Sequence, residues 1–254
     1  MGTFQSGGIT LGYDDIGPRD GRPIVLLHGF ASNRGENWKR LGWYGAFERK
    51  GYRIIALDWR GHGESAKPHD RGAYAREALI GDVFALMDHL EIERADLMGY
   101  SMGARLALAA ALVRPARIAH LVLGGIGGAL FERAHDPEAM VAAMTADNPE
   151  TIAEPMLKSF RHFADEQGED RLALAACAQS RGDGFTPDMA SALAVPTLVV
   201  AGARDALAGD PDALAAAIPG ARAVTVPGCD HFSAIPHALF KASVFDFLDD
   251  MMDF

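Results

Sequence analysis

Short apolar segments alternate with amphipathic segments along most of the chain. Six runs of six to eight residues are rich in Val, Ile, Leu and Ala and end at Gly, Asp or Ser, which is typical of buried strands: residues 23–29, 53–58, 95–101, 118–125, 196–202 and 222–228. Residues 76–90 and 243–252 carry apolar side chains at helical spacing. This alternation predicts an α/β protein built on a mostly parallel sheet.

One segment, residues 127–190, breaks the alternation. It holds three helical stretches, at 136–147, 149–167 and 169–180, and no convincing strand. Because it lies between two predicted strands, we expect it to cover the carboxyl edge of the sheet as a helical cap, with residues 1–126 and 191–254 forming the core of one domain. Its candidate substrate-facing side chains are flexible or aromatic: Met140, Met144, Leu157, Phe160 and Phe163.

Composition narrows the class of protein. A chain of 254 residues with 49% hydrophobic content can bury a full core, and its two cysteines have no metal or redox spacing, which favours a reduced, cytoplasmic setting. A net charge of -10 without a basic, aromatic-rich cluster argues against nucleic acid as a partner. The first residues lack the pattern of an export signal, and no run approaches the roughly 20 apolar residues of a membrane span.

The sequence GYSMG, residues 99–103, is a candidate nucleophile motif. This G-x-S-x-G pattern is weak on its own in a chain with 28 glycines, but it follows a predicted strand and precedes the helical run 104–113. Its flanking glycines permit the sharp strand-to-helix turn that presents a serine hydroxyl clear of the sheet. The alternative is that Ser101 only caps the helix.

A serine nucleophile needs a base, and the base needs an acid that orients it. His231 follows the predicted strand 222–228 and is the candidate base, because His237, behind Pro236, is expected to begin a helix. Asp205 follows the strand 196–202, which gives the chain order Ser, Asp, His.

The identity of the acid stays open at this point. Asp210 and Asp230 lie close in sequence to Asp205 and His231 and are alternatives. Asp205 is favoured because it follows its strand directly and a helix can then begin at Pro211.

Negative charge that develops on a carbonyl oxygen requires preorganised N–H donors. The expected donors are the backbone of Met102, directly after the serine, and that of Phe30, in the loop after the strand 23–29. Gly29 allows close approach there, and His28 is interpreted as a structural residue rather than a second base.

Five motifs together resemble the serial motifs of the α/β-hydrolase superfamily: HGF (28–30), LDWRGHGES (57–65), GYSMGA (99–104), AGARD (201–205) and GCDHF (228–232). The resemblance spans nearly the whole chain and points to the branch of small capped esterases, carbon–carbon bond hydrolases and cofactor-free haloperoxidases. It implies the α/β-hydrolase fold, an eight-stranded, mostly parallel sheet flanked by helices with a small cap, and the triad Ser101, Asp205 and His231. In such proteins the positions of Asp58 and Arg60 are usually architectural.

Departures from related patterns exclude some subclasses. The serine at position 101 and the absence of tyrosine between residues 127 and 190 argue against dehalogenases and epoxide hydrolases of this superfamily. The sequence GGIGGAL (124–130) has Leu130 where a dinucleotide loop needs its third glycine, so we interpret it as a flexible cap hinge. Without a zinc-protease or P-loop motif either, no metal or organic cofactor is expected.

The sequence therefore predicts a serine hydrolase that cleaves small, neutral, short- to medium-chain carboxylic esters. One alternative is a carbon–carbon bond hydrolase or lactonase with the same triad. Another, of a different class, is a signalling receptor of this superfamily with slow turnover. The oligomeric state stays open.

Overall fold

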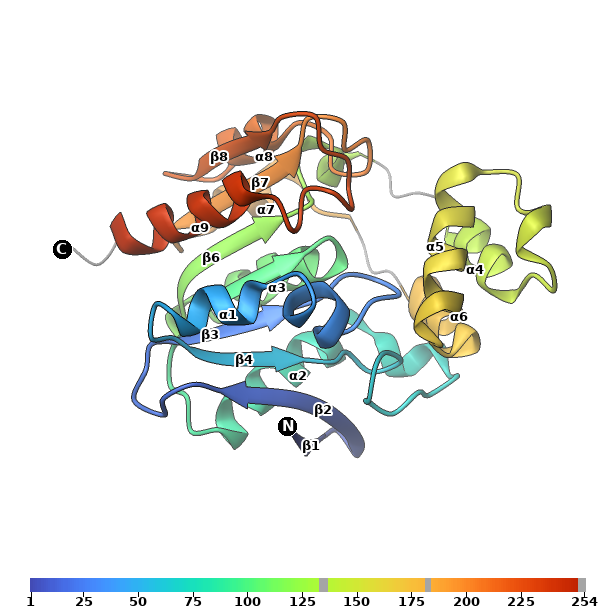
Figure 1. The fold of residues 1–254 in the computed structure, drawn as a ribbon, viewed down its shortest axis with the longest axis horizontal. Helices are drawn as coiled ribbons and strands as arrows, with labels where there is room; N and C mark the ends of the chain where they lie inside the picture. Colours follow the sequence, from blue (N-terminus) through green and yellow to red (C-terminus); the bar gives the residue numbers. More distant parts are fainter. Residues whose placement is uncertain (133–136, 181–183, 251–254) are drawn as a thin grey trace.

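One eight-stranded sheet forms the centre of the protein in the computed structural model, which describes residues 1–132, 137–180 and 184–250 (Figure 1). The strands are β1 (Gly2–Ser6), β2 (Ile9–Ile16), β3 (Pro23–Leu27), β4 (Arg53–Leu57), β5 (Ala95–Tyr100), β6 (Ile118–Gly124), β7 (Thr197–Gly202) and β8 (Arg222–Val226). Their spatial order is β1-β2-β4-β3-β5-β6-β7-β8. The pairs β1/β2 and β2/β4 are antiparallel and the remaining pairs are parallel, so the predicted mostly parallel, eight-stranded sheet is confirmed.

All six strands predicted from apolar runs are present, with ends within two residues of the predicted ones. The apolar pattern did not predict β1 and β2. These two strands form an antiparallel hairpin at the edge of the sheet, where several of their residues are exposed or half-buried. A strand that buries one face carries fewer apolar residues than a central strand, so its run is harder to recognise.

Helices cover both faces of the sheet (Figure 1). Side chains of α2 (Arg76–His89), α3 (Met102–Val113) and α8 (Pro211–Ala217) pack in one core cluster, and those of α1 (Trp43–Glu48) and α9 (Ala238–Asp250) pack in a second one. Shorter helical segments connect these elements: Gly35–Lys39, Arg71–Tyr74, Pro115–Arg117 and Gly128–Phe131. The sheet between the two clusters is fully buried at β4, β5 and β7, which explains why these strands are almost continuously apolar.

Three helices stand together over the carboxyl ends of the strands: α4 (Pro137–Thr145), α5 (Pro155–Gln167) and α6 (Arg171–Gln179), with the short turn Pro149–Thr151 between the first two (Figure 1). We call α4–α6 the cap helices. They share a cluster of their own, which includes Met144, Phe160 and Leu174 and reaches Phe30 of the core.

The cap helices cover a shorter part of the chain than the predicted insertion 127–190, because they begin at Pro137 and end at Gln179. After the cap, Phe185 and Ala190 of the α7 region (Pro187–Ser191) join the core cluster beneath α2 and α3. Before the cap, the N–H groups of Gly128 and Ala129 donate to the carbonyl oxygens of Asp210 and Ala208. These ends of the predicted insertion therefore contact the core, and the segment 127–131, predicted to be a flexible hinge, is hydrogen-bonded to the residues before α8.

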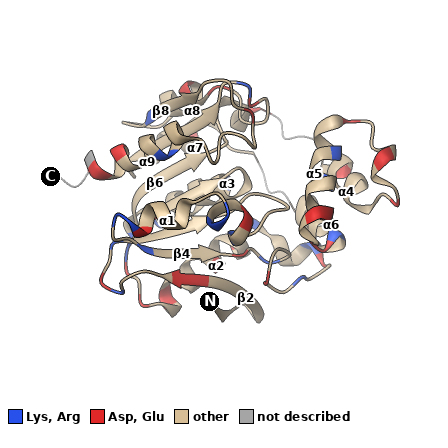
Figure 2. Cartoon of the chain, viewed as in Figure 1, with Lys and Arg blue, Asp and Glu red and all other residues tan. Residues whose placement is uncertain are grey.

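Acidic and basic side chains are interspersed along the core and the cap helices (Figure 2). Within the described ranges, no helix combines the length and apolar character needed to cross a membrane.

Candidate active site

Ser101 lies at the tight turn between β5 and α3. Its φ of 53° and ψ of -113° are a strained combination for a residue with a side chain. A Cβ at Gly99 would collide with the carbonyl group of Gly103, and a Cβ at Gly103 would collide with the carbonyl oxygen of Leu27. Both glycines are thus required sterically, and the turn raises the serine side chain at the carboxyl edge of the sheet.

His231 and Asp205 complete a hydrogen-bonded line with this serine. The Oγ of Ser101 lies 2.9 Å from Nε2 of His231, and Nδ1 of the same ring lies 2.8 Å from Oδ2 of Asp205. Since a carboxylate only accepts, Nδ1 carries the proton and Nε2 is free to accept the serine proton. Asp205 and His231 are each 4% exposed, so the pair is shielded from bulk water.

The two alternative acids have other partners. Asp210 is the N-cap of α8, where its Oδ1 accepts a hydrogen bond from the N–H of Asp212. Asp230 accepts from the N–H groups of Phe232 and Ser233, and these bonds lower the pKa of its carboxyl. Of the three aspartates, Asp205 is the one that contacts His231.

The loop after β3 lies beside the serine. A Cβ built on Gly29 would be 3.5 Å from Cβ of Ser101, and the N–H of Gly29 donates to the side chain of Asn37 over 3.1 Å. The ring of His28 is tied at both nitrogens, with Nδ1 2.8 Å from the carbonyl oxygen of Gly29 and Nε2 accepting from the N–H of Trp59. Burial lowers the pKa of His28 to about 3, so the ring is neutral and fixes the loop, as expected from the sequence.

The two predicted oxyanion donors flank the serine. Phe30 lines the same cavity as Ser101, and Met102 is the first residue of α3. The first N–H groups of a helix have no acceptor inside the helix, and they point toward its positive end. The N–H of Met102 can therefore meet an anionic oxygen near Ser101 Oγ, and the same role for the N–H of Phe30 stays a prediction.

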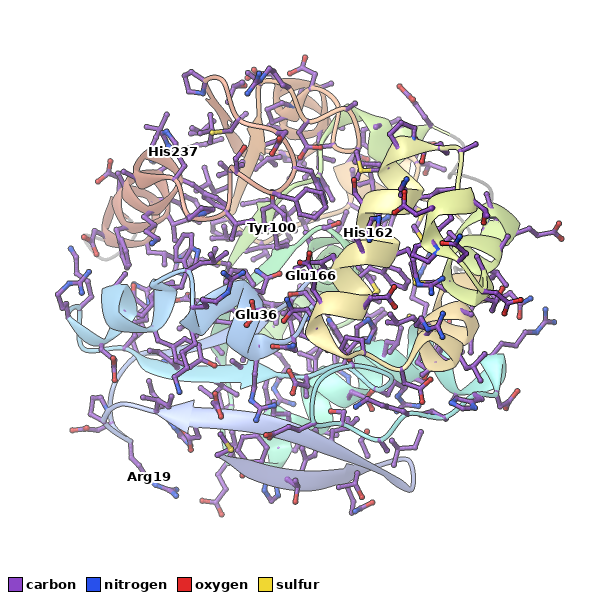
Figure 3. The ribbon with its side chains drawn as sticks, turned by 45° about the vertical axis from the view of Figure 1, so that its right-hand side comes forward. Arg19, Glu36, Tyr100, His162, Glu166 and His237 are labelled. Carbon is purple, nitrogen blue, oxygen red and sulfur yellow. The ribbon has the colours of Figure 1, made fainter. Side chains whose placement is uncertain are left out.

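A cavity of about 240 Å³ opens onto this group. It is mostly apolar and is lined by Gly29, Phe30, Ser32, Glu36, Asn37, Arg40, Leu41, Tyr100, Ser101, Phe160, Phe163, His231, Phe232 and Ile235. In the view of Figure 3, the labels of Glu36 and Tyr100, which line the cavity, lie beside α5, and His237 lies near α9, away from the cap helices. His237 accepts a hydrogen bond from the N–H of Leu239, which agrees with its predicted place at a helix start.

The cap residues predicted to face substrate fall into two groups. Phe160 and Phe163 line the cavity, and Phe160 contacts Phe30 with a ring centroid distance of 6.0 Å. Met140, Met144 and Leu157 do not line it: they belong to the cluster between the cap helices, where Met144 is fully buried. They were chosen from the sequence because their side chains are flexible and apolar, but these side chains pack in the cluster between the cap helices instead of lining the cavity.

The charged residues of the cavity lie on its core side. Arg40 forms an ion pair with Glu36, and both line the cavity. In the cap, Lys158 pairs with Glu150, and the buried Arg161 donates to the carbonyl oxygens of Ala143 and Ala146. The sequence analysis did not identify Glu36 and Arg40, because the helical segment 35–39 gave no sign that it borders the site.

Tyr100 and Phe232 also escaped the sequence reasoning. The hydroxyl of Tyr100 donates to the carbonyl oxygen of His231, and Phe232 lies against both the His231 ring and Phe160. Tyr100 directly precedes Ser101 and Phe232 directly follows His231 in the sequence, and this adjacency could have indicated that both residues lie at the site.

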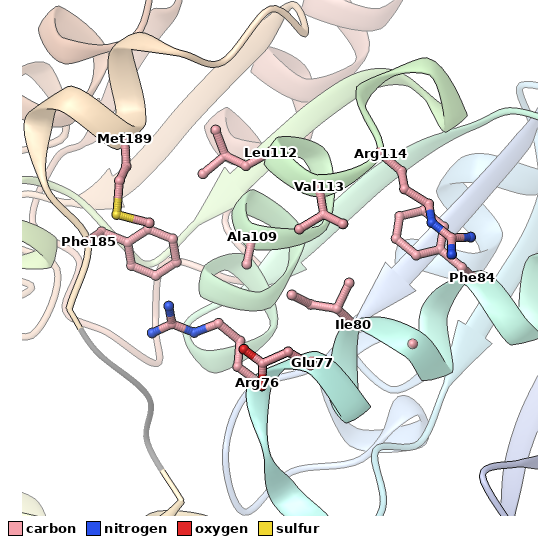
Figure 4. Close-up of a pocket in the computed structure, with 11 residues that line it drawn as sticks. Arg76, Glu77, Ile80, Phe84, Ala109, Leu112, Val113, Arg114, Phe185 and Met189 are labelled. Atoms are coloured by element: carbon pink, nitrogen blue, oxygen red, sulfur yellow. The ribbon is translucent and has the colours of Figure 1, made fainter.

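A second, larger cavity of about 320 Å³ lies elsewhere, between α2, α3 and the α7 region (Figure 4). Its walls include Ile80, Leu112, Phe185 and Met189 and none of the predicted site residues. Among the described residues, no group of three or more His, Cys, Asp or Glu side chains could hold a metal ion.

The chain is similar to known proteins both in sequence and in structure. The sequence model of a family described as "alpha/beta hydrolase fold" matches residues 22–192. The chain is 36% identical, over 241 residues and 89% of its length, to the "Dihydrolipoyllysine-residue acetyltransferase component of acetoin cleaving system" of Pseudomonas putida. It spans 63% of the length of that relative.

Two solved structures superpose over almost the whole chain. A hydrolase from Pseudomonas aeruginosa PA01 has a TM-score of 0.81 and 27% identity, covering 97% of both chains. The enol-lactonase from Burkholderia xenovorans LB400 has a TM-score of 0.78 and 28% identity, covering 98% of this chain and 100% of the other.

Proposed function

Because this chain belongs to the α/β-hydrolase fold family, we propose that it hydrolyses carboxylic esters through a covalent acyl intermediate on Ser101. The observation that carries the proposal is the hydrogen-bonded line from Asp205 through His231 to Ser101, beside a cavity of about 240 Å³. A serine hydroxyl is a poor nucleophile at neutral pH, and a neutral imidazole at 2.9 Å is the group that activates it.

The proposed reaction has two halves. Nε2 of His231 takes the Ser101 proton as Oγ bonds to the ester carbon, and the carbonyl electron pair moves onto oxygen, where the N–H groups of Phe30 and Met102 stabilise it. The bond to the alcohol oxygen then breaks as His231 returns the proton to it. A water molecule, deprotonated by the same ring, releases the carboxylic acid and restores Ser101. Asp205 orients the ring and stabilises its charged form.

The cavity supports small, uncharged substrates. Its volume of about 240 Å³ is slightly below the roughly 300–1,000 Å³ that is common for small-molecule sites. Phe160, Phe163 and Phe232 present apolar surface to an acyl chain. The one lining arginine, Arg40, is already paired with Glu36, so an anionic ester gains little there.

Lactones are a second candidate substrate class. A lactone is a cyclic ester, so the same nucleophile, base and oxyanion donors open it. The similarity to the enol-lactonase, at 28% identity over 98% of this chain, favours this candidate.

A substrate panel tests the proposal: p-nitrophenyl esters from acetate to palmitate, lactones and vinylogous diketones, each with the wild type and Ser101→Ala. Because each buried methylene contributes about 0.8 kcal/mol, kcat/KM is expected to rise over the first few carbons and then fall when the cavity is full. Ser101→Ala is expected to remove turnover.

Other results would point to the alternatives. Rates that climb steadily to palmitate contradict an enclosed acyl site. Turnover of the diketones in place of the esters indicates a carbon–carbon bond hydrolase. Tight ligand binding with a single slow turnover indicates a receptor.

A further inference from the structure

Glu169, in the turn between α5 and α6, is a buried carboxylate that crosses from the cap to the core. It is 8% exposed, and both its oxygens accept hydrogen bonds from the N–H of Gly63, at 3.1 and 2.9 Å. The side-chain amide of Asn33 donates to it over 3.2 Å. One side chain of the cap thus binds two separate loops of the core.

Both of these loops belong to the surroundings of the site. Asn33 lies three residues after Phe30, in the loop that follows β3, and Gly63 lies in the loop that follows β4. The carboxylate of Asp58 joins the two loops, because it accepts from the N–H of Arg34 over 2.7 Å and from that of Glu64 over 2.9 Å. Glu169 therefore binds two loops that Asp58 already holds together.

On the cap side, Glu169 follows directly on α5, which ends at Gln167. Its own N–H donates to the carbonyl oxygen of Ala164, so its backbone is held against the last turn of that helix. The same helix carries Phe160 and Phe163, which line the cavity beside Ser101. A bond at the end of α5 consequently limits how far these two rings can move from the serine.

We propose that the Glu169 carboxylate is a latch that positions α5 over the cavity and thereby sets the size of substrate that Ser101 accepts. The inference rests on the proposed function and adds a specificity-determining residue outside the triad. Glu169 acts through Phe160 and Phe163 and does not itself line the cavity.

The surroundings of the carboxyl fit a positioning role. Burial raises the pKa of the Glu169 carboxyl, and the neighbouring charge of Asp58 raises it further. The hydrogen bonds from Asn33 and Gly63 and the charge of Lys67 partly oppose this rise. A buried, hydrogen-bonded carboxylate adds little net stability compared with an apolar side chain of similar size, but it fixes geometry through directional bonds. One residue further on, Asp170 lies 2.9 Å from Nε2 of His69, which gives the same turn a second, more exposed link to the core.

The test compares Glu169→Ala, Glu169→Gln and Glu169→Asp with Glu166→Ala. Gln keeps an acceptor for Gly63 without the charge, and Asp keeps the charge but shortens the reach by one methylene. Glu166 is an exposed acidic residue in the last turn of α5, labelled in Figure 3. Its replacement controls for the loss of one negative charge. Thermal unfolding of each variant establishes that it is folded.

The first readout does not depend on turnover. Hydrogen exchange at the Gly63 amide is expected to accelerate by about tenfold or more in Glu169→Ala, less in Glu169→Gln, and not at all in Glu166→Ala. Unchanged exchange in both Glu169→Ala and Glu169→Gln overturns the latch. This readout still decides the matter if the wild type cleaves no ester, an outcome that would count against the proposed function alone.

The second readout is size selectivity. The ratio of kcat/KM for p-nitrophenyl decanoate to that for the acetate is expected to rise about tenfold in Glu169→Ala, chiefly through KM, because α5 can then move away from the serine. Glu169→Gln should show an intermediate ratio and Glu166→Ala the ratio of the wild type. Faster exchange with an unchanged ratio would overturn the link to substrate size. If no ester is cleaved, rates of Ser101 labelling by short- and long-chain fluorophosphonates replace the ratio.

Discussion

The hydroxyl of Tyr100 donates a hydrogen bond of 2.5 Å to the carbonyl oxygen of His231, and the two rings lie 5.4 Å apart. Tyr100, which directly precedes Ser101, therefore holds the backbone of His231 in place. Burial raises the pKa of Tyr100 well above its usual value, and the nearby charge of Asp205 adds to the rise, so the hydroxyl keeps its proton and remains a donor.

Tyr100→Phe is expected to lower kcat by about two- to tenfold with little change in KM, because the lost hydrogen bond contributes about 0.5–1.5 kcal/mol to holding His231. Steady-state kinetics on p-nitrophenyl butyrate measures this. Tyr13→Phe, in the edge hairpin, serves as the control and should leave both constants unchanged. An unchanged kcat in Tyr100→Phe would show that Asp205 alone fixes the imidazole.

The strained backbone of Ser101 predicts a difference between two inactive variants. Ser101→Ala and Ser101→Gly should both lose labelling by a fluorophosphonate, because the nucleophilic oxygen is gone. Glycine tolerates the φ of 53°, so Ser101→Gly should be more stable than Ser101→Ala by about 1 kcal/mol. Urea unfolding provides the comparison. Labelling that survives either substitution would place the nucleophile elsewhere.

The three aspartates near the site are expected to differ sharply. Asp205→Asn should lower turnover by about 10⁴-fold, because an amide in this position favours the wrong tautomer of His231. Asp210→Asn and Asp230→Asn should change turnover by less than about fivefold, since these carboxylates accept bonds from nearby backbone N–H groups and have no contact with the ring. A large loss in Asp230→Asn with a small one in Asp205→Asn would reverse the assignment of the acid.

Two buried histidines predict the pH dependence of stability. Burial lowers the pKa of His28 and of His62 to about 3, from a usual value of 6.5. Below about pH 6.5 the unfolded chain binds a proton at each position that the folded chain does not bind. The free energy of unfolding should therefore fall with falling pH, by up to about 1.4 kcal/mol per pH unit for each histidine.

Urea unfolding between about pH 7 and about pH 5 measures this slope. His62→Asn should reduce it by up to about 1.4 kcal/mol per pH unit, because one of the two groups is removed. His162, whose side chain is 44% exposed, serves as the control, and His162→Asn should keep the slope of the wild type. The same slope in wild type and His62→Asn would mean that the folded protein protonates His62 near the usual pKa.

Much of the fold and of the site could be predicted from local patterns. The central strands bury both faces, so their apolar runs are continuous, and parallel strands bring their carboxyl ends to one edge of the sheet. Polar residues in the turns that follow three parallel strands, Ser101, Asp205 and His231, were therefore expected together, and the structure brings them within hydrogen-bonding distance. The edge hairpin of β1 and β2 escaped because its side chains are only partly buried.

What the sequence by itself determined is thus the alternation of the six strands after the hairpin with helices along the chain, the position of the serine turn and the polar residues that follow the strands. Only the tertiary structure decided which apolar cap residues meet the cavity, Phe160 and Phe163, and which meet other helices, Met140 and Met144. It also decided that Glu169 binds Gly63, 106 positions away in the chain. The physical reason is that periodicity fixes the direction of a side chain relative to its own helix or strand, whereas its partner depends on how separate elements pack, and that is set by contacts distant in sequence.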